Sequence, residues 1–212
     1  AKLVSYGARL TEFHAHGRDG TMADIVLGFD GLPSYVATNT YFGATCGRYG
    51  NRIKNGRFTI GGRQFQVDRN EGSNHLHGGR SGFDRKVWAA LADESLNAVT
   101  FTMTSPDGEQ GFPGTVHIST TYRLTDDNVL AIRMRGSTDA PTLLNAVHHT
   151  YWNLAGQGAG DVRSQELQLF SDFYTPIDNE LITTGEVLSV AGTAFDFRST
   201  KPIGRDIDTL GD

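Results

Sequence analysis

Hydrophobic and polar positions alternate along this chain in short runs, most clearly over residues 98–104 and 115–124. A period of two places successive side chains on opposite faces of a β-strand. Other short runs rich in β-branched and aromatic residues predict further strands, at 2–10, 24–28, 57–60, 64–67, 129–135, 143–149, 166–170, 173–176 and 186–190. No segment keeps a helical period over three turns, so only residues 32–37 and the region around 203–210 are short helix candidates.

Turn signals between these runs predict two β-hairpins. Gly61-Gly62 separates residues 57–60 from 64–67, and residues 126–128 separate 115–124 from 129–135. Ten or more short strands with frequent turns predict an all-β protein, an antiparallel sandwich or barrel. The chain has no Pro-rich linker, low-complexity block or clean repeat, which favours one domain over residues 1–212.

The composition narrows the class of protein. Hydrophobic residues make up 38% of the 212 residues, enough for a sizeable core. A net charge of −5 without a basic stripe argues against a nucleic-acid partner. No apolar stretch approaches the roughly 20 residues of a membrane helix, so no membrane partner is expected. The single cysteine, Cys46, excludes an internal disulfide and a cysteine-based metal site, and we expect it to be buried.

Four segments are dense in residues that bind polar ligands or move protons: 43–53, 74–79, 109–114 and 144–154. In the first, Asn51 and Arg52 offer directed hydrogen bonds that suit a hydroxyl-rich or anionic ligand. The alternative is a glycine-rich loop that carries surface arginines. The segment 109–114 is interpreted as a structural bend before a strand.

The histidines fall in two of these segments. His75 and His77 are two residues apart, so on a strand they would share a face. We favour a hydrogen-bonding or proton-transferring histidine over a metal ligand there, and solvated loop histidines are the alternative. His148 and His149 are adjacent, so only one of them can face a given pocket.

Two aromatic residues follow the second histidine pair. Tyr151 and Trp152 could form a wall against which a sugar ring stacks. The alternative interpretation is a buried strand with core aromatic side chains.

The polar segments, in this order and spacing, resemble the aldose 1-epimerase (galactose mutarotase) family. The matching stretches are Gly47-Arg48-Tyr49-Gly50-Asn51-Arg52-Ile53, Asn74-His75-Leu76-His77-Gly78-Gly79, Gly82-Phe83-Asp84 followed by Trp88, Glu109 with Gly111-Phe112-Pro113-Gly114, His149-Thr150-Tyr151-Trp152-Asn153-Leu154, Thr175-Pro176-Ile177-Asp178, Thr184-Gly185-Glu186 and Gly192-Thr193-Ala194-Phe195-Asp196-Phe197. The resemblance implies a large antiparallel β-sandwich of the galactose mutarotase-like type. It also implies interconversion of the α and β anomers of free hexoses such as D-glucose and D-galactose, with no metal and no organic cofactor.

The resemblance also implies roles for individual residues. His149 matches the general acid that protonates the sugar ring oxygen. His77 matches a second active-site histidine that bonds sugar oxygens near the reacting centre. Arg52 matches the substrate-binding arginine, with Asn51 beside it. His148 stands where many relatives carry asparagine.

In the family, the general base is a glutamate near the C-terminus of a chain longer than this one. A substrate-binding aspartate comes from the same later part of that chain. No glutamate of this sequence matches the base, and Glu109 and Glu186 are interpreted as structural. We therefore expect the chain to lack its C-terminal strands, and a missing or separate C-terminal segment to carry the base.

Two other functions stay open from the sequence. A hexose-6-phosphate 1-epimerase would need cations for the phosphate, and the candidates are Arg48, Arg52, Lys54 and Arg57. A non-catalytic sugar-binding or regulatory protein of the same fold would keep the site and lack the base. Nothing in the sequence directs export, so we expect a cytoplasmic location and leave a periplasmic one open.

Overall fold

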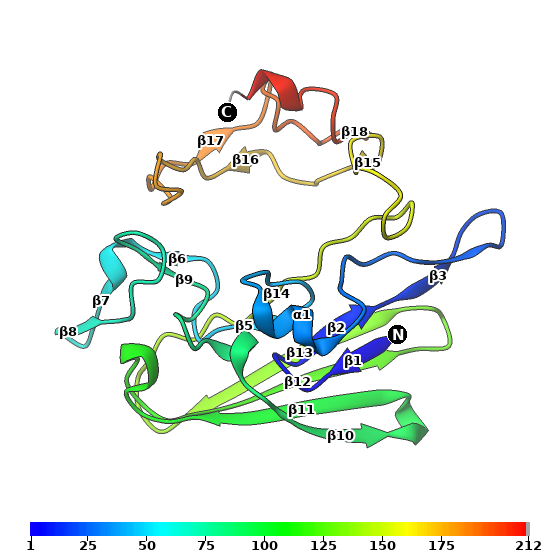
Figure 1. Cartoon of the computed structure of the whole chain (residues 1–212). Coiled ribbons are helices and arrows are strands. Elements are labelled where there is room, and N and C mark those ends of the chain that lie inside the picture. The colour runs from blue at the N-terminus through cyan, green and yellow to red at the C-terminus, as the bar shows by residue number, and fades with distance from the viewer. Residues whose placement is uncertain (211–212) are drawn as a thin grey trace. The chain divides into compact units, whose positions relative to one another are not determined.

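The computed structural model describes residues 1–210, which form mostly short antiparallel strands (Figure 1). The chain divides into two compact units. Unit 1 comprises residues 1–13 and 27–151, and unit 2 comprises residues 14–26 and 152 onwards. The prediction of one sandwich domain over residues 1–212 stays a prediction. No helix of the described residues is both long and apolar enough to cross a membrane.

Unit 1 is built on a four-stranded antiparallel sheet with the order β10, β11, β12, β13 (Figure 1). The strands are β10 (Ala89–Asp93), β11 (Ala98–Ser105), β12 (Val116–Leu124) and β13 (Leu130–Thr138). The alternating runs at 98–104 and 115–124 and the run at 129–135 therefore form the predicted strands, and β12 and β13 form the predicted hairpin. Strand β10 was not predicted, because all five of its residues are exposed and no alternation marks it.

The core of unit 1 lies against one face of β12. Val116, Ile118, Thr120 and Tyr122 alternate with more exposed residues along this strand and are all buried. The Tyr122 hydroxyl donates to the Ala8 carbonyl oxygen at 2.6 Å, and the buried hydroxyls of Thr45 and Thr120 lie 3.3 Å apart. Hydrogen bonds of this kind let polar groups enter a core at little cost.

Shorter strand pairs complete unit 1: β1 (Lys2–Val4) with β2 (Arg9–Glu12), β5 (Thr45–Cys46) with β14 (Val147–His148), β6 (Arg52–Ile53) with β9 (His75–Leu76), and β7 (Arg57–Ile60) with β8 (Arg63–Gln66). The hairpin at Gly61-Gly62 and the helix α1 (Leu32–Ala37) are confirmed. A single strand over 2–10 is wrong, because Gly7 and Ala8 adopt positive φ and turn the chain back on itself. Four 3-10 helices also belong to unit 1: η1 (Lys54–Gly56), η2 (Phe83–Arg85), η3 (Glu94–Leu96) and η4 (Glu109–Gly111).

Unit 2 contains β3 (His14–His16) with β4 (Met22–Asp24), β15 (Glu166–Leu167) with β18 (Lys201–Pro202), and β16 (Phe173–Tyr174) with β17 (Leu188–Ser189). The runs at 166–170, 173–176 and 186–190 thus pair over only two residues each. The predicted strand 24–28 does not form, and within it Val26 makes an isolated bridge to Trp152. Of the predicted helix near 203–210, only the 3-10 turn η5 (Ile207–Thr209) is present.

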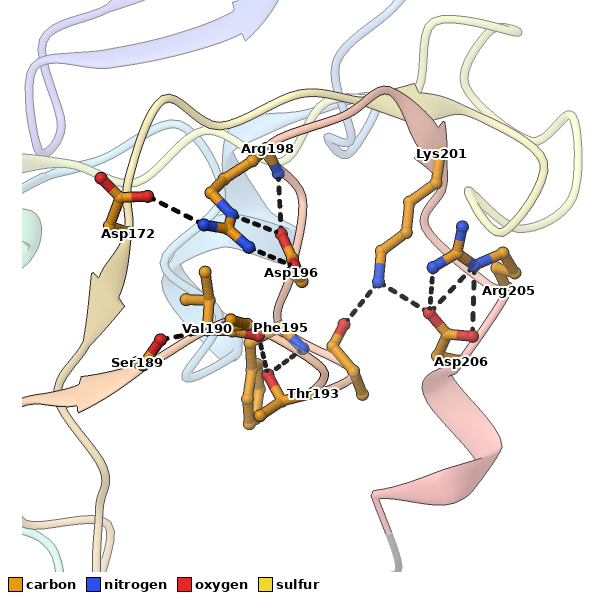
Figure 2. Close-up of polar contacts among 12 residues, drawn as sticks. Asp172, Ser189, Val190, Thr193, Phe195, Asp196, Arg198, Lys201, Arg205 and Asp206 are labelled. Atoms are coloured by element: carbon orange, nitrogen blue, oxygen red, sulfur yellow. Dashed lines mark hydrogen bonds and ion pairs between the residues drawn. The ribbon is translucent and has the colours of Figure 1, made fainter.

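A network of ion pairs organises the end of unit 2 (Figure 2). Lys201 is the buried member, and its Nζ donates to the Ala194 carbonyl oxygen and to Asp206, both at 2.7 Å. Arg198 bridges Asp172 and Asp196. The network joins the Phe195-Asp196-Phe197 stretch to its surroundings, which indicates a structural role for that motif.

Candidate active site

The two histidines matched to the family's active site meet in unit 1. The ring centroids of His77 and His149 lie 4.9 Å apart, with the rings nearly perpendicular at 83°. The His149 backbone N–H donates to the Ala44 carbonyl oxygen at 2.9 Å, so the end of β14 is joined to the glycine-rich segment. His149 itself lies between two aromatic rings, those of Tyr41 at 5.4 Å and Tyr151 at 5.0 Å.

His148 and His149 point in opposite directions, as the strand pattern predicts. The His148 ring packs edge-on against the buried Tyr122 of β12 at 5.5 Å, and its Nε2 bonds to the Thr150 hydroxyl at 3.1 Å. His149 alone therefore faces His77.

His75 and His77 do not share a face, contrary to the expectation from their spacing. Strand β9 ends at Leu76, and His77 adopts φ +51°. His75 is fully buried, where its Nδ1–H donates to the Asp68 carbonyl oxygen at 2.7 Å and its Nε2 accepts the Gly78 N–H at 3.1 Å. These bonds use both nitrogens, so His75 is a structural histidine. No group of three or more histidine, cysteine, aspartate or glutamate side chains suited to a metal occurs among residues 1–210.

The hydrogen bonds of His77 define its tautomer. The Asn51 backbone N–H donates to His77 Nδ1 at 3.0 Å, and the His77 backbone N–H donates to the Asn51 carbonyl oxygen at 3.1 Å. Because Nδ1 accepts, the proton of the neutral ring lies on Nε2. Burial, followed by the nearby His149 and Arg52, lowers the pKa of His77 to about 4. At neutral pH His77 is therefore an uncharged donor.

A carboxylate holds Arg52 next to His77 and Asn51. Its Nε and Nη2 donate to the two oxygens of Glu71 at 2.5 and 2.6 Å, and its Nη1 lies 3.4 Å from Asn51 Oδ1. Arg52 opens β6 and pairs with Leu76 of β9, directly before His77. All four residues matched to the family's site, His77, His149, Asn51 and Arg52, thus come together.

A cavity of about 570 Å³ adjoins these residues. It is lined by Asn39, Tyr41, Asn70, Glu71, Leu76, Gly79, Arg80 and Arg85. Its volume is in the range of small-molecule sites, and its amide, hydroxyl and charged groups suit a ligand rich in hydroxyls. Tyr41 joins the cavity to the histidines, because its ring also lies 4.6 Å from that of His77.

Tyr41 and Glu71 are residues of the candidate site that the sequence analysis missed. Burial raises the pKa of Tyr41 to about 12, so its hydroxyl stays protonated and can donate. A signal existed in both cases, since Tyr41 shortly precedes the glycine-rich segment 43–53 and Glu71 precedes the segment 74–79. Glycine is required at Gly78 of the latter, because its φ is +96° and a Cβ there would overlap the Gly47 carbonyl oxygen.

Other residues of the predicted segments are structural. Arg48 is only 2% exposed, and its guanidinium donates to Ser105, Pro106, Pro113 and Gly114. Cys46 is buried as expected, and burial raises the pKa of its thiol well above the usual value. Glu109 accepts from Ser105 and pairs with Lys86. Of the predicted aromatic wall, Tyr151 packs on His149, and Trp152 belongs to unit 2.

Replacing His148 by asparagine should flatten the dependence of stability on pH. Burial and the neighbouring His149 lower the pKa of His148 to about 4, against 6.5 as its ordinary value. The folded state thus binds a proton on His148 less readily than the unfolded state does. The contribution of neutral His148 to the free energy of unfolding is therefore complete above pH 6.5 and is lost as the pH falls from 6.5 towards 4. The loss from His148 between pH 7.5 and pH 5 is about 2 kcal/mol.

Urea denaturation at the two pH values measures this effect. Between pH 7.5 and pH 5, the free energy of unfolding should fall less for His148→Asn than for the wild type. His117→Asn is the control, because His117 is an exposed histidine in the same unit. Equal losses in His148→Asn and in the wild type would contradict the prediction.

Comparisons with known proteins identify the relatives of this chain. The family model described as aldose 1-epimerase matches residues 1–210. Galactose mutarotase of Bos taurus is 40% identical over 205 residues, which cover 97% of this chain and 59% of the relative. Aldose 1-epimerase of Escherichia coli K12 is 39% identical over 204 residues, 96% of this chain and 58% of the relative. The chain therefore spans just under three fifths of these relatives' length.

Solved structures show the same fold. The GalM/aldose epimerase homologue from C. elegans superposes with a TM-score of 0.89 at 32% identity, over 96% of this chain and 63% of that one. Galactose 1-epimerase from Lactobacillus acidophilus NCFM gives a TM-score of 0.85 at 32% identity, over 99% of this chain and 60% of that one. The strand-rich architecture predicted from the sequence is thereby confirmed.

Proposed function

This chain belongs to the aldose 1-epimerase family, and on that premise we propose that it interconverts the α and β anomers of free hexoses such as D-glucose and D-galactose. The observation that carries the proposal is the perpendicular contact of His77 and His149, 4.9 Å apart, beside Asn51 and the Glu71-bound Arg52. Two histidines next to directed donors are suited to proton transfer on a hydroxyl-rich ligand.

Anomer interconversion needs two proton transfers. A base removes the proton of the anomeric hydroxyl while an acid protonates the ring oxygen, so the C1–O5 bond breaks and an open-chain aldehyde forms. Rotation about C1–C2 presents the other face of the carbonyl, and the reverse transfers close the ring. We assign the acid to His149. Burial lowers its pKa, which makes the protonated ring a stronger proton donor to the ring oxygen. The neutral ring left after donation takes the proton back from that oxygen when the sugar recloses.

His77 and Arg52 have binding roles in this scheme. Nε2–H of His77 donates to a sugar oxygen near the reacting carbon, because Nδ1 is already occupied by the Asn51 N–H. Arg52 and Asn51 bind hydroxyl groups, which holds the open-chain sugar in place until it recloses. Tyr41 adds a protonated hydroxyl on the cavity side.

We propose that the general base is a carboxylate carried on a segment other than residues 1–212. Within the cavity the acidic side chain is Glu71, and both of its oxygens accept hydrogen bonds from Arg52. A carboxylate held in this way is a poor base, which supports a base from elsewhere.

Neither alternative has an observation in its favour. For a hexose-6-phosphate 1-epimerase, two of the four candidate cations are already used, Arg48 in the core and Arg52 by Glu71. A non-catalytic sugar-binding protein would use the same residues without a base, so activity decides between it and our proposal.

The test is the polarimetric decay of freshly dissolved α-D-glucose and α-D-galactose in a weakly catalytic buffer. We expect the protein, with the segment that carries the base present, to accelerate the decay, and the ratio of the two rates gives the preferred sugar. A folded protein that binds either sugar and accelerates neither reaction would support the sugar-binding alternative. We further propose a cytoplasmic location, which cell fractionation would check against a periplasmic one.

A further inference from the structure

The three arginines at the candidate site each have a carboxylate partner. The pairs are Arg52 with Glu71, Arg80 with Asp68, and Arg85 with Asp84. Each pair is neutral as a whole. The site is therefore rich in hydrogen-bond donors with little net charge, and the charged residues that line the cavity are Arg80, Arg85 and Glu71.

Glu71 differs from the other two carboxylates in its accessibility. Its side chain is 38% exposed and lines the cavity, whereas the side chain of Asp84 is 4% exposed and that of Asp68 is 18% exposed. Neither Asp68 nor Asp84 lines the cavity. A ligand in the cavity thus meets the negative charge of Glu71 directly.

Glu71 also occupies the part of Arg52 that would best bind an anion. A guanidinium binds phosphate or carboxylate through two parallel N–H donors. Glu71 already takes such a pair, Nε and Nη2, at 2.5 and 2.6 Å. The remaining nitrogen, Nη1, lies near Asn51 Oδ1 at 3.4 Å and can donate to a single hydroxyl oxygen.

Resting on the proposed function, we infer that Glu71 is a specificity-determining residue that makes the site select neutral sugars over phosphorylated ones. It does so in two ways: it competes for the Arg52 fork, and it repels a second anion in the cavity. Rejection of an unwanted ligand by a like charge is a common route to specificity. A neutral hexose loses nothing by this arrangement, because its hydroxyls need only single hydrogen bonds.

The variant Glu71→Gln tests the inference, because it removes the charge and keeps one oxygen that can accept from Arg52. We expect the ratio of the dissociation constants for D-glucose 6-phosphate and D-glucose to fall on the order of tenfold, the effect of one unit charge at several ångströms. Added salt should reduce the change, since screening weakens it. NMR titration of the isotope-labelled protein at low ionic strength gives both constants without needing catalysis.

The matched control is Glu94→Gln, which removes the same charge from η3 of unit 1. Glu94 does not line this cavity. It should leave the ratio within about twofold of the wild type. The inference is overturned if Glu71→Gln changes the ratio no more than Glu94→Gln does. It is equally overturned if the wild type binds D-glucose 6-phosphate as tightly as D-glucose, a result that needs no variant.

Failure of the proposed function gives a different result. If the wild type, with the segment that carries the base present, does not accelerate anomer interconversion in the polarimeter, the proposed function fails, while the binding ratios still decide the role of Glu71. Should Glu71→Gln be poorly folded, Glu71→Ala removes the same charge and the same competition for Arg52, and the same fall in the ratio is expected.

Discussion

Replacing His149 by alanine is expected to lower the catalysed rate of anomer interconversion by roughly 10²–10⁴-fold, the usual contribution of one positioned proton transfer. The change removes the proposed acid, while Arg52, Asn51 and His77 remain to bind the sugar. The loss should therefore appear in kcat, with KM changed only slightly. Polarimetry at several sugar concentrations separates the two constants.

His148→Asn is the control for this experiment. It removes the adjacent histidine, whose ring packs on Tyr122 and away from His77. We expect it to keep most of the wild-type rate at pH 7.5. An His149→Ala protein that is folded and retains more than about a tenth of the wild-type kcat would remove His149 from the catalytic role.

Replacing Arg48 by methionine is expected to lower the free energy of unfolding by about 3–5 kcal/mol, the usual cost of breaking a buried charged network. The guanidinium donates to four backbone carbonyl oxygens and one hydroxyl at 2.6–3.0 Å, in a position that is 2% exposed. Methionine fills similar space and donates to none of these acceptors. Since a domain is stable by about 5–15 kcal/mol, the effect is large.

Urea denaturation followed by circular dichroism measures this loss. Arg57→Met is the control, because Arg57 lies exposed on β7 and its Nε bonds to the Gln66 side chain. That change should cost less than about 1 kcal/mol, as surface interactions usually do. A cost below about 1 kcal/mol for Arg48→Met would show that the carbonyl groups find other partners, and the structural assignment of Arg48 would be wrong.

Much of the fold follows from local patterns in the sequence. Strands β11 and β12 alternate because one face of each packs on the core, and the turn residues 126–128 bring β13 back beside β12. Gly61-Gly62 adopts the positive φ values that its tight turn requires. These elements could be predicted because the signal lies within the residues that form them.

Other elements have no such signal. Strand β10 is exposed along its whole length, and it is a strand only because β11 pairs with it. Residues 2–10 contain enough β-forming residues for one strand, but the turn at Gly7 and Ala8 divides them. In both cases contacts with another segment outweigh the local preference.

The sequence by itself determined the strand-rich class and the family, and it proposed His149, His77, Arg52 and Asn51 as site residues, because motif spacing and residue type are local properties. Only the tertiary structure decided which neighbour each side chain meets. It placed Arg48 in the core and Arg52 on Glu71, separated His75 from His77, and packed Tyr41 against both site histidines. A side chain's charge, tautomer and accessibility depend on partners from distant segments, and no local pattern records them.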